Sequence, residues 1–166
     1  MLRVPLVLLS LVFLHGCGSD PTTGPTSVRW DRETCTRCAM AVGDRRFSAQ
    51  VREDQAPFRV HLFDDIGCAV IWLDQNPEKD SGNFEIWVND HLTGEWVDAR
   101  QAGYVSVNQS PMGYNLGAVS EASTNALDYT AAVAHIRNIE SSQRIHGGGG
   151  HQASSNSQTT AGSTKP

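Results

Sequence analysis

The sequence predicts a small α+β domain made of two tandem ββαβ-type repeats. Several short segments alternate apolar and polar residues, which is the period of a half-buried strand. Two other segments carry apolar residues at helical spacing. The predicted strands and helices follow one another in a similar order in both halves of residues 27–140. This order predicts a duplicated unit in which helices pack against antiparallel strands.

The first half of the domain has clear start and stop signals. In order along the chain it predicts a strand, a strand, a helix, a strand and a turn, at residues 47–51, 58–63, 66–76, 84–88 and 89–94. Asp64 and Asp65 precede the helix, and a carboxylate there can cap its N-terminus. Pro77 prevents the helix from continuing past Asn76.

The second half predicts three strands followed by a longer helix. These elements are placed at residues 95–98, 104–107, 116–119 and 121–139. Ser120 is the predicted N-cap of the helix, since a serine hydroxyl can accept a hydrogen bond from the first turn. Leu127, Ala131 and Ala134 recur at the spacing of one helix face.

The N-terminal end is predicted to be a lipoprotein signal peptide at residues 1–16. Arg3 precedes an 11-residue apolar stretch, which is the length of a signal-peptide h-region. Residues 14–17 read Leu-His-Gly-Cys, the form of a bacterial lipobox. We therefore expect lipid at Cys17 and a tether at residues 17–26, with the protein anchored in the cell envelope and facing the periplasm. An ordinary secretory signal that contains a cysteine is the alternative.

Residues 141–166 are predicted to form a disordered tail. They contain four consecutive glycines at positions 147–150, followed by Ser, Gln, Thr and Asn. So few hydrophobic residues cannot offset the entropy lost when a backbone is ordered. The folded part is therefore predicted to be residues 27–140.

The charge of the chain excludes some classes of protein. The formal net charge is −5, and residues 27–140 hold 10 basic and 17 acidic residues. Such an acidic domain is not expected to bind nucleic acid, whose phosphates need clustered Lys and Arg. No apolar run approaches the roughly 20 residues of a membrane-spanning helix. The sequence predicts no oligomeric state.

The number of cysteines points to a metal site. The chain has four, and lipid on Cys17 would leave three thiols: Cys35, Cys38 and Cys68. An odd number leaves at least one thiol free after any internal disulfide. A free thiol is a liability in an oxidising compartment unless a ligand occupies it. We therefore predict that a metal is that ligand.

The segment at residues 35–40 reads Cys-Thr-Arg-Cys-Ala-Met and predicts Cu(I) as the metal. A C-x-x-C turn lets the thiolates of Cys35 and Cys38 converge on one ion. Met40 can add a thioether if the segment is extended, because residues i and i+2 lie on one side of a strand. Thiolate and thioether ligands select Cu(I), whereas zinc prefers four Cys or His ligands, which this spacing does not provide.

Two other interpretations of the cysteines stay open. A C-x-x-C dithiol is also typical of an exported thiol-disulfide oxidoreductase, although no long helix follows Cys38 to activate it. The second interpretation is a structural disulfide that joins Cys35 to Cys38 or Cys68. Cys68 lies one turn into the first predicted helix, where a buried small hydrophobe is favoured over a ligand. Met112 lies in a predicted turn, either packed on the core or exposed.

Several motifs resemble the NosL family, the accessory lipoproteins of nitrous oxide reductase. The similarity covers residues 29–140 together with the lipobox, and it includes residues 35–40, 49–50, 63–68, 87–90, 102–105 and 111–113. The C-x-x-C pair alone is a weak signal. The order C-x-x-C-x-M, F-D-D-I-G-C and P-M-G is specific.

The resemblance implies a non-enzymatic, membrane-tethered Cu(I) chaperone and a fold similar to that of organomercurial lyase. It implies that copper is delivered to nitrous oxide reductase; another exported copper enzyme is the alternative client. It assigns the copper ligands most directly to Cys38 and Met40, with Cys35 and Met112 as additions. An organomercurial-cleaving activity would rest on fold analogy alone.

Overall fold

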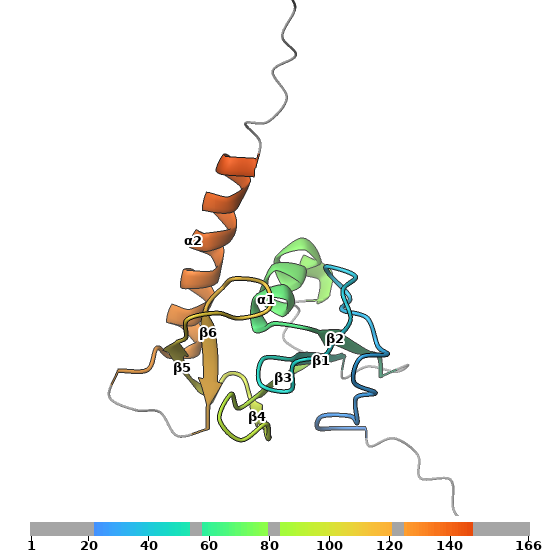
Figure 1. Cartoon of the computed structure of the whole chain (residues 1–166). Helices are drawn as coiled ribbons and strands as arrows, with labels where there is room; N and C mark the ends of the chain where they lie inside the picture. Colours follow the sequence, from blue (N-terminus) through green and yellow to red (C-terminus); the bar gives the residue numbers. More distant parts are fainter. Residues whose placement is uncertain (1–21, 54–57, 80–83, 121–124, 148–166) are drawn as a thin grey trace, which may run out of the picture.

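The computed structural model describes residues 22–53, 58–79, 84–120 and 125–147. These residues form a small mixed α+β domain with antiparallel sheets and two helices (Figure 1). The strands are β1 (Ala49–Glu53), β2 (Val60–Phe63), β3 (Phe84–Asn89), β4 (Trp96–Asp98), β5 (Gly103–Ser106) and β6 (Leu116–Val119). The helices are α1 (Ile66–Gln75) and α2 (Tyr129–Gly147), with a 3-10 turn at Pro77–Lys79. None of the described helices is long and apolar enough to cross a membrane.

The larger sheet has the order β2-β1-β3-β4, and all of its pairs are antiparallel. Helix α1 covers one face of it and buries Ile66, Ala69 and Val70. Side chains alternate between the two faces of a strand, yet both Val51 and Gln50 of the central strand β1 are buried. The second face is therefore covered as well.

The N-terminal segment covers that second face. The Gln50 side chain accepts a hydrogen bond from the Thr26 backbone N–H at 2.9 Å and donates to its carbonyl at 2.9 Å. The Arg52 Nε donates to the Gly24 carbonyl at 2.7 Å, and the Gly24 N–H donates to Glu85. Residues 24–26 of the predicted tether are thus packed on the sheet, whereas residues 1–21, with the predicted signal peptide and Cys17, lie outside the described residues.

The first half agrees closely with the sequence prediction. Helix α1 begins after Asp65, whose side chain accepts from the Gly67 N–H, and ends at Gln75, before Asn76 and Pro77. The predicted strands at 47–51, 58–63 and 84–88 correspond to β1, β2 and β3, with ends shifted by up to two residues. This half has the clearest capping and stop signals, which explains the agreement.

The predicted boundaries of the second helix are wrong. Backbone hydrogen bonds join Leu127 to Tyr104 in both directions, at 2.8 and 2.9 Å, so the chain is extended there. Helix α2 begins only at Tyr129, after the Asp128 carboxylate accepts from the Ala131 N–H at 2.8 Å. It then continues to Gly147, into the segment predicted to be disordered from residue 141. The rest of that tail, residues 148–166, lies outside the described residues.

The predicted pair of ββαβ repeats, and with it the likeness to organomercurial lyase, is not confirmed. Strand β4, assigned to the second unit, pairs with β3 and completes the first sheet. Strands β5 and β6 form a separate two-stranded sheet beside α2. Figure 1 shows this second group next to α1, and the loop between β5 and β6 reaches the N-terminal end of α1. The site lies where the two groups meet.

Candidate metal centre

The two cysteines of the C-x-x-C motif lie on one tight hairpin. Thr34 and Ala41 form an antiparallel bridge, and the Cys35 N–H donates to the Met40 carbonyl at 2.8 Å. The Ala39 N–H donates to the Cys35 carbonyl at 3.0 Å, and Ala39 has a positive φ of 60°. This left-handed residue closes the turn that carries both cysteines.

Helix α1 supplies a third thiol from a different part of the chain. Asp65 caps the helix, which places Cys68 in its first turn. The sulfur atoms of Cys35, Cys38 and Cys68 all lie within 4.8 Å of one another. Among the described residues this is the one group of three or more Cys, His, Asp or Glu side chains close enough to share a metal ion.

Two residues of the cluster are buried, and the third is more accessible. Cys35 and Cys68 are 2% and 0% exposed, whereas Cys38 is half-buried. All three are free cysteines, so no disulfide competes for the sulfurs. The Thr36 N–H donates to the carbonyl of Leu62 on β2 at 2.8 Å, which ties the hairpin to the edge of the sheet.

The three thiols are electrostatically unequal. A hydrogen bond from Cys68 lowers the pKa of Cys35 to about 5, helped by the backbone N–H groups of Cys38, Asp64 and Arg37 and opposed by burial. The same contact with Cys35 raises the pKa of Cys68, and burial raises it further. Burial also raises the pKa of Cys38. One thiolate is therefore ready for a cation, and two protons leave when all three sulfurs bind.

A buried carboxylate links the start of α1 to the loop that carries Met112. Asp65 is 0% exposed; its carboxylate accepts from the Gly67 N–H at 2.9 Å, the Ser110 hydroxyl at 2.6 Å and the Met112 N–H at 3.3 Å. Burial raises the pKa of Asp65, and these donors oppose that shift. The F-D-D-I-G-C and P-M-G motifs therefore meet through this residue, which positions Cys68 and Met112 relative to each other.

Arg37 joins the cluster to α2. Its Nη1 lies 3.9 Å from the Cys68 sulfur and 3.1 Å from the Tyr114 hydroxyl. Its Nη2 lies 2.7 Å from Glu140 Oε1, and the Tyr114 hydroxyl donates to Glu140 Oε2 at 2.7 Å. A positive charge thus lies directly beside the sulfurs, held by a helix more than 100 residues further along the chain.

The two methionines predicted as ligands lie in different surroundings. Met40 is 52% exposed, and the hairpin register places it opposite Cys35. The condition set for Met40 to reach the same ion, an extended backbone between Cys38 and Met40, is not met, because Ala39 has a positive φ of 60° and turns the chain. Met112 is partly buried and packs against the core. The structure brings Cys35 and Cys38 together as predicted, and Cys17 lies outside the described residues.

Cys68 was predicted to be a buried small hydrophobe, and its place in the sulfur cluster was missed. It is buried, but its sulfur also faces the other two. Two signals in the sequence could have identified it: the odd number of thiols, and its position just after an aspartate N-cap. The second places a thiol at the positive end of a helix dipole.

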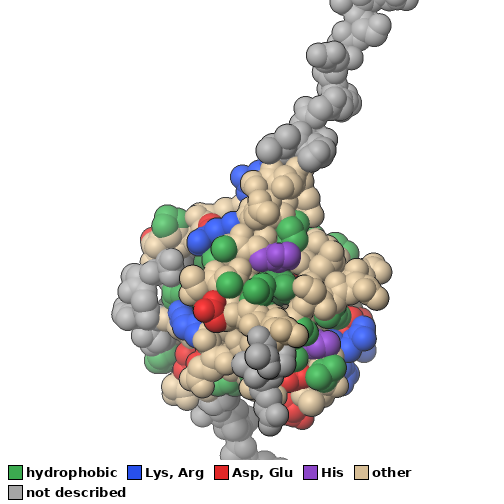
Figure 2. All heavy atoms as spheres, turned by 90° about the vertical axis from the view of Figure 1, so that its left-hand side faces the viewer, with side chains coloured by type: hydrophobic (Ala, Val, Ile, Leu, Met, Phe, Trp, Pro, Cys, Tyr) green, Lys and Arg blue, Asp and Glu red, His purple; other side chains and the backbone are tan. Residues whose placement is uncertain are grey.

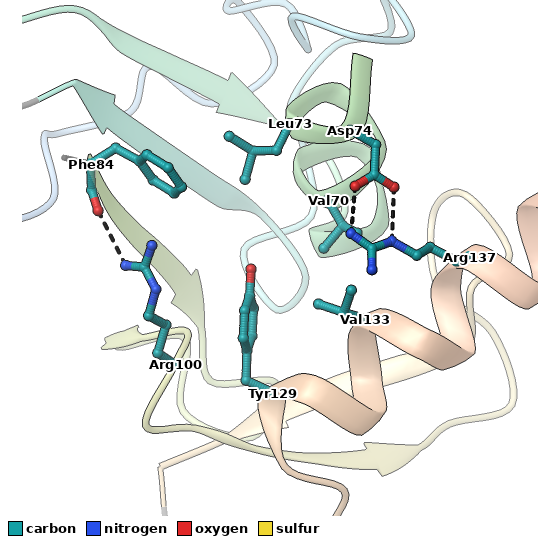
Figure 3. Close-up of a pocket in the computed structure, with 8 residues that line it drawn as sticks. All are labelled: Val70, Leu73, Asp74, Phe84, Arg100, Tyr129, Val133 and Arg137. Atoms are coloured by element: carbon teal, nitrogen blue, oxygen red, sulfur yellow. Dashed lines mark hydrogen bonds and ion pairs between the residues drawn. The ribbon is translucent and has the colours of Figure 1, made fainter. Parts of the chain in front are cut away.

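A separate cavity of about 170 Å³ lies between α1, α2 and β3 and contains no cysteine (Figure 3). Val70, Leu73 and Val133 form apolar walls, and the hydroxyl of Tyr129 points into the space. Arg137 pairs there with Asp74 at 2.6 Å. The face of the molecule over α2, β5 and β6 mixes hydrophobic, basic and acidic side chains (Figure 2).

Among the described residues, neither this cavity nor this face presents a second group of thiols like Cys35, Cys38 and Cys68. The cysteine cluster is therefore the stronger candidate site.

The comparisons with known proteins give one structural likeness. No family model matches the chain, and no curated protein matches it. The structure is similar to the crystal structure of the copper chaperone NosL from Shewanella denitrificans, with a TM-score of 0.49 and 18% sequence identity. The similarity covers 71% of this chain and 88% of that chain.

Proposed function

We propose that this protein is a Cu(I) carrier that binds copper at Cys35, Cys38 and Cys68 and passes it to an exported copper enzyme. The observation that supports this most directly is the convergence of three sulfurs, from two separate elements, within 4.8 Å. Soft thiolate ligands select Cu(I), whereas structural zinc takes four ligands. Copper is the cargo of this site.

The uneven burial of the cluster suits transfer. Cys35 and Cys68 hold the ion on the protected side, while the half-buried Cys38 is the most accessible residue of the three. A partner thiolate, thioether or imidazole can enter beside Cys38 and replace one protein sulfur at a time. The exposed Met40 thioether lies on the same hairpin and is the proposed accessory ligand during uptake and release. Met112, on the loop held by Asp65, is proposed as a second.

The proposed location and client rest on motifs in the sequence. The lipobox supports lipid attachment at Cys17, on the periplasmic side of the cell envelope. A lipid anchor confines the search for a partner to the membrane surface, which raises its effective concentration. The motifs shared with the NosL family favour nitrous oxide reductase as the client over other exported copper enzymes.

Anaerobic Cu(I) titration against a competing chelator tests the carrier function. We expect Cys38→Ser and Cys68→Ser each to weaken Cu(I) binding by about 100-fold, and Met40→Leu by about tenfold. Thr36 lies between the two cysteines of the hairpin, and Thr36→Ser keeps every sulfur. This control variant should bind Cu(I) like the wild type. Unchanged affinity in Cys38→Ser and Cys68→Ser would overturn the proposal.

Two further assays test the finer claims. Loaded protein should transfer copper to copper-free nitrous oxide reductase, and Cys38→Ser should not; transfer to other copper enzymes alone would identify a different client. Membrane fractionation of cells that express the full chain tests the anchor. Cys17→Ser should move the protein from the membrane to the soluble fraction, and a protein that is soluble in both forms would contradict it.

A thiol-disulfide oxidoreductase is the second candidate, favoured by the low pKa of Cys35, about 5. A redox-active cysteine needs an accessible thiolate, yet Cys35 is only 2% exposed. The more accessible Cys38 has a raised pKa because of its burial. Reduction of a substrate disulfide at a rate that depends on Cys38 would support this alternative; no reduction would exclude it.

A further inference from the structure

We propose that Arg37 sets the preference of the cysteine cluster for a monovalent ion over divalent ions of similar softness. Its guanidinium supplies a fixed positive charge beside a site that is more negative with Cu(I) bound than with a divalent ion bound. This inference rests on the proposed function, since it concerns the selectivity of the same three sulfurs.

The guanidinium is aimed at the cluster from within the cysteine hairpin. Arg37 lies between the two cysteines in sequence, and its side chain is 18% exposed. Nη1 lies 3.9 Å from the sulfur of Cys68. At such a short distance and in partly desolvated surroundings, a charge is weakly screened by salt and acts strongly on the sulfurs.

Neighbouring groups hold the guanidinium in this orientation. Nη1 also donates to the Tyr114 hydroxyl and Nη2 to Glu140, so each terminal nitrogen has an oxygen partner. The Tyr114 ring is itself fixed against Gly67, where an added Cβ would lie 2.1 Å from a ring carbon. Arg37 is therefore positioned before any ion arrives, and binding does not have to order it.

Glu140 does not cancel the charge of Arg37. Arg144 also contacts Glu140, with 3.2 Å between Nη2 and Oε1. Two guanidinium groups therefore share one carboxylate, while Tyr114 is held neutral because burial raises its pKa. One net positive charge remains in the group formed by these four residues, and Arg37 is the member that reaches the sulfur.

The charge of the bound ion decides how strongly Arg37 stabilises the complex. Three thiolates with Cu(I) carry a net charge of −2, and with a divalent ion such as Cd(II) they carry −1. Both ions start from the same free site, so the ratio of their affinities depends only on the difference between the two complexes. That difference is one unit of charge, and a nearby cation favours the more negative complex.

The test measures Cu(I) and Cd(II) affinities of the full chain, anaerobically, by chelator competition. Arg37→Gln, which removes the charge, should lower the Cu(I)/Cd(II) affinity ratio by about tenfold. Arg37→Lys, which keeps the charge, should leave the ratio within about threefold of the wild type. Arg137→Gln is the matched control, because its guanidinium pairs with Asp74 at the border of the cavity that contains no cysteine, and it should not change the ratio.

A purely structural role for Arg37 gives a different result, since a distorted site loses affinity for both ions in parallel. Parallel loss, or an unchanged ratio in Arg37→Gln, overturns the proposal. If Arg37→Gln does not fold, Glu140→Gln serves as the second variant: removing a negative charge near the site should raise the ratio by about threefold, and an unchanged or lower ratio overturns the proposal. Failure of wild-type Cu(I) binding would instead overturn the proposed function.

Discussion

Two arginine–carboxylate pairs tie α2 to the first half of the domain, and they differ in their surroundings. The inner pair joins Arg37 to Glu140 at 2.7 Å, with side chains 18% and 13% exposed. The outer pair joins Arg137 to Asp74 at 2.6 Å, with side chains 56% and 35% exposed. Both are short, but the inner pair borders the sulfur cluster and the outer pair borders the cavity in Figure 3.

The difference shows that the N···O distance of an ion pair does not by itself indicate how much the pair contributes to stability. An exposed pair gains little, because water and salt screen the attraction and two long side chains must be ordered. A partly buried pair is expensive to break, because the partner that remains keeps a poorly solvated charge. We therefore expect changes around the inner pair to affect both stability and metal binding, and changes around the outer pair to affect neither strongly.

The largest loss of stability is expected for Gly67→Ala, which disturbs the support of the inner pair. The new methyl group would lie 2.1 Å from the ring of Tyr114, which is 1% exposed and has little room to move. Overpacking of this kind destabilises by about 3 kcal/mol. Urea denaturation measures the change in the free energy of unfolding.

A double mutant tests this cause. Adding Tyr114→Leu to Gly67→Ala removes the ring that the methyl group meets. The double mutant should therefore lose less stability than the sum of the two single mutants. Simple additivity would show that the clash with Tyr114 is not the source of the effect.

Stability of the copper-free protein should next depend on pH through Cys35. Its pKa is lowered from 9.0 to about 5 by Cys68. A lowered pKa means that the stabilisation is present in full above the pKa of the unfolded chain and is lost as the pH falls toward 5. Between pH 6 and 8 the free energy of unfolding should rise with pH, by up to about 1.4 kcal/mol per pH unit. Urea denaturation across this range measures the slope.

Cys35→Ser is the control for the pH dependence, because it removes the titrating thiol and keeps a similar side-chain size. We expect it to flatten the slope. Copper loading should also change the slope, since the thiols of Cys38 and Cys68 then lose their protons on binding. The same slope in wild type and Cys35→Ser would show that another group titrates.

Breaking the inner pair directly should have the next largest effect. Glu140→Ala leaves Arg37 without its carboxylate in a partly buried place, and we expect a loss of about 2 kcal/mol, below the cost for a fully buried pair. Thermal or urea unfolding measures it. Arg144→Gln removes the exposed partner of the same carboxylate, with a side chain 65% exposed, and should change stability far less. Equal losses in both variants would contradict the assigned role of burial.

The first half of the fold was predictable because its signals are local. The Asp65 side chain caps α1 by accepting a hydrogen bond from the Gly67 N–H, two residues further on, and the helix ends before Pro77. The start of α2 was not predictable in this way. Residues before Tyr129 have helical spacing, but Leu127 pairs with Tyr104 in a strand-like bridge, and this distant partner overrides the local preference.

In the candidate site, too, the contacts between residues close in sequence were predictable and the contacts between distant residues were not. The C-x-x-C pair is close in sequence, so the meeting of Cys35 and Cys38 was predicted. The contributions of Cys68 and Glu140 were missed because they depend on how α1 and α2 pack. The cysteine count and the helix cap contained a partial signal for Cys68. No spacing rule connects Arg37 to a carboxylate on the last helix.

The smallest effect is expected for the outer pair. Arg137→Gln removes an ion pair whose guanidinium donates two hydrogen bonds to Asp74, at 2.9 and 2.6 Å. Both side chains are well exposed to solvent, so water replaces the lost contacts, and we expect a loss of at most about 1 kcal/mol that shrinks further at high salt. Urea unfolding at low and high salt measures it. A loss comparable to that of Glu140→Ala, or one that salt does not reduce, would show that the outer pair also acts as a buried contact, and the contrast between the two pairs would then fail.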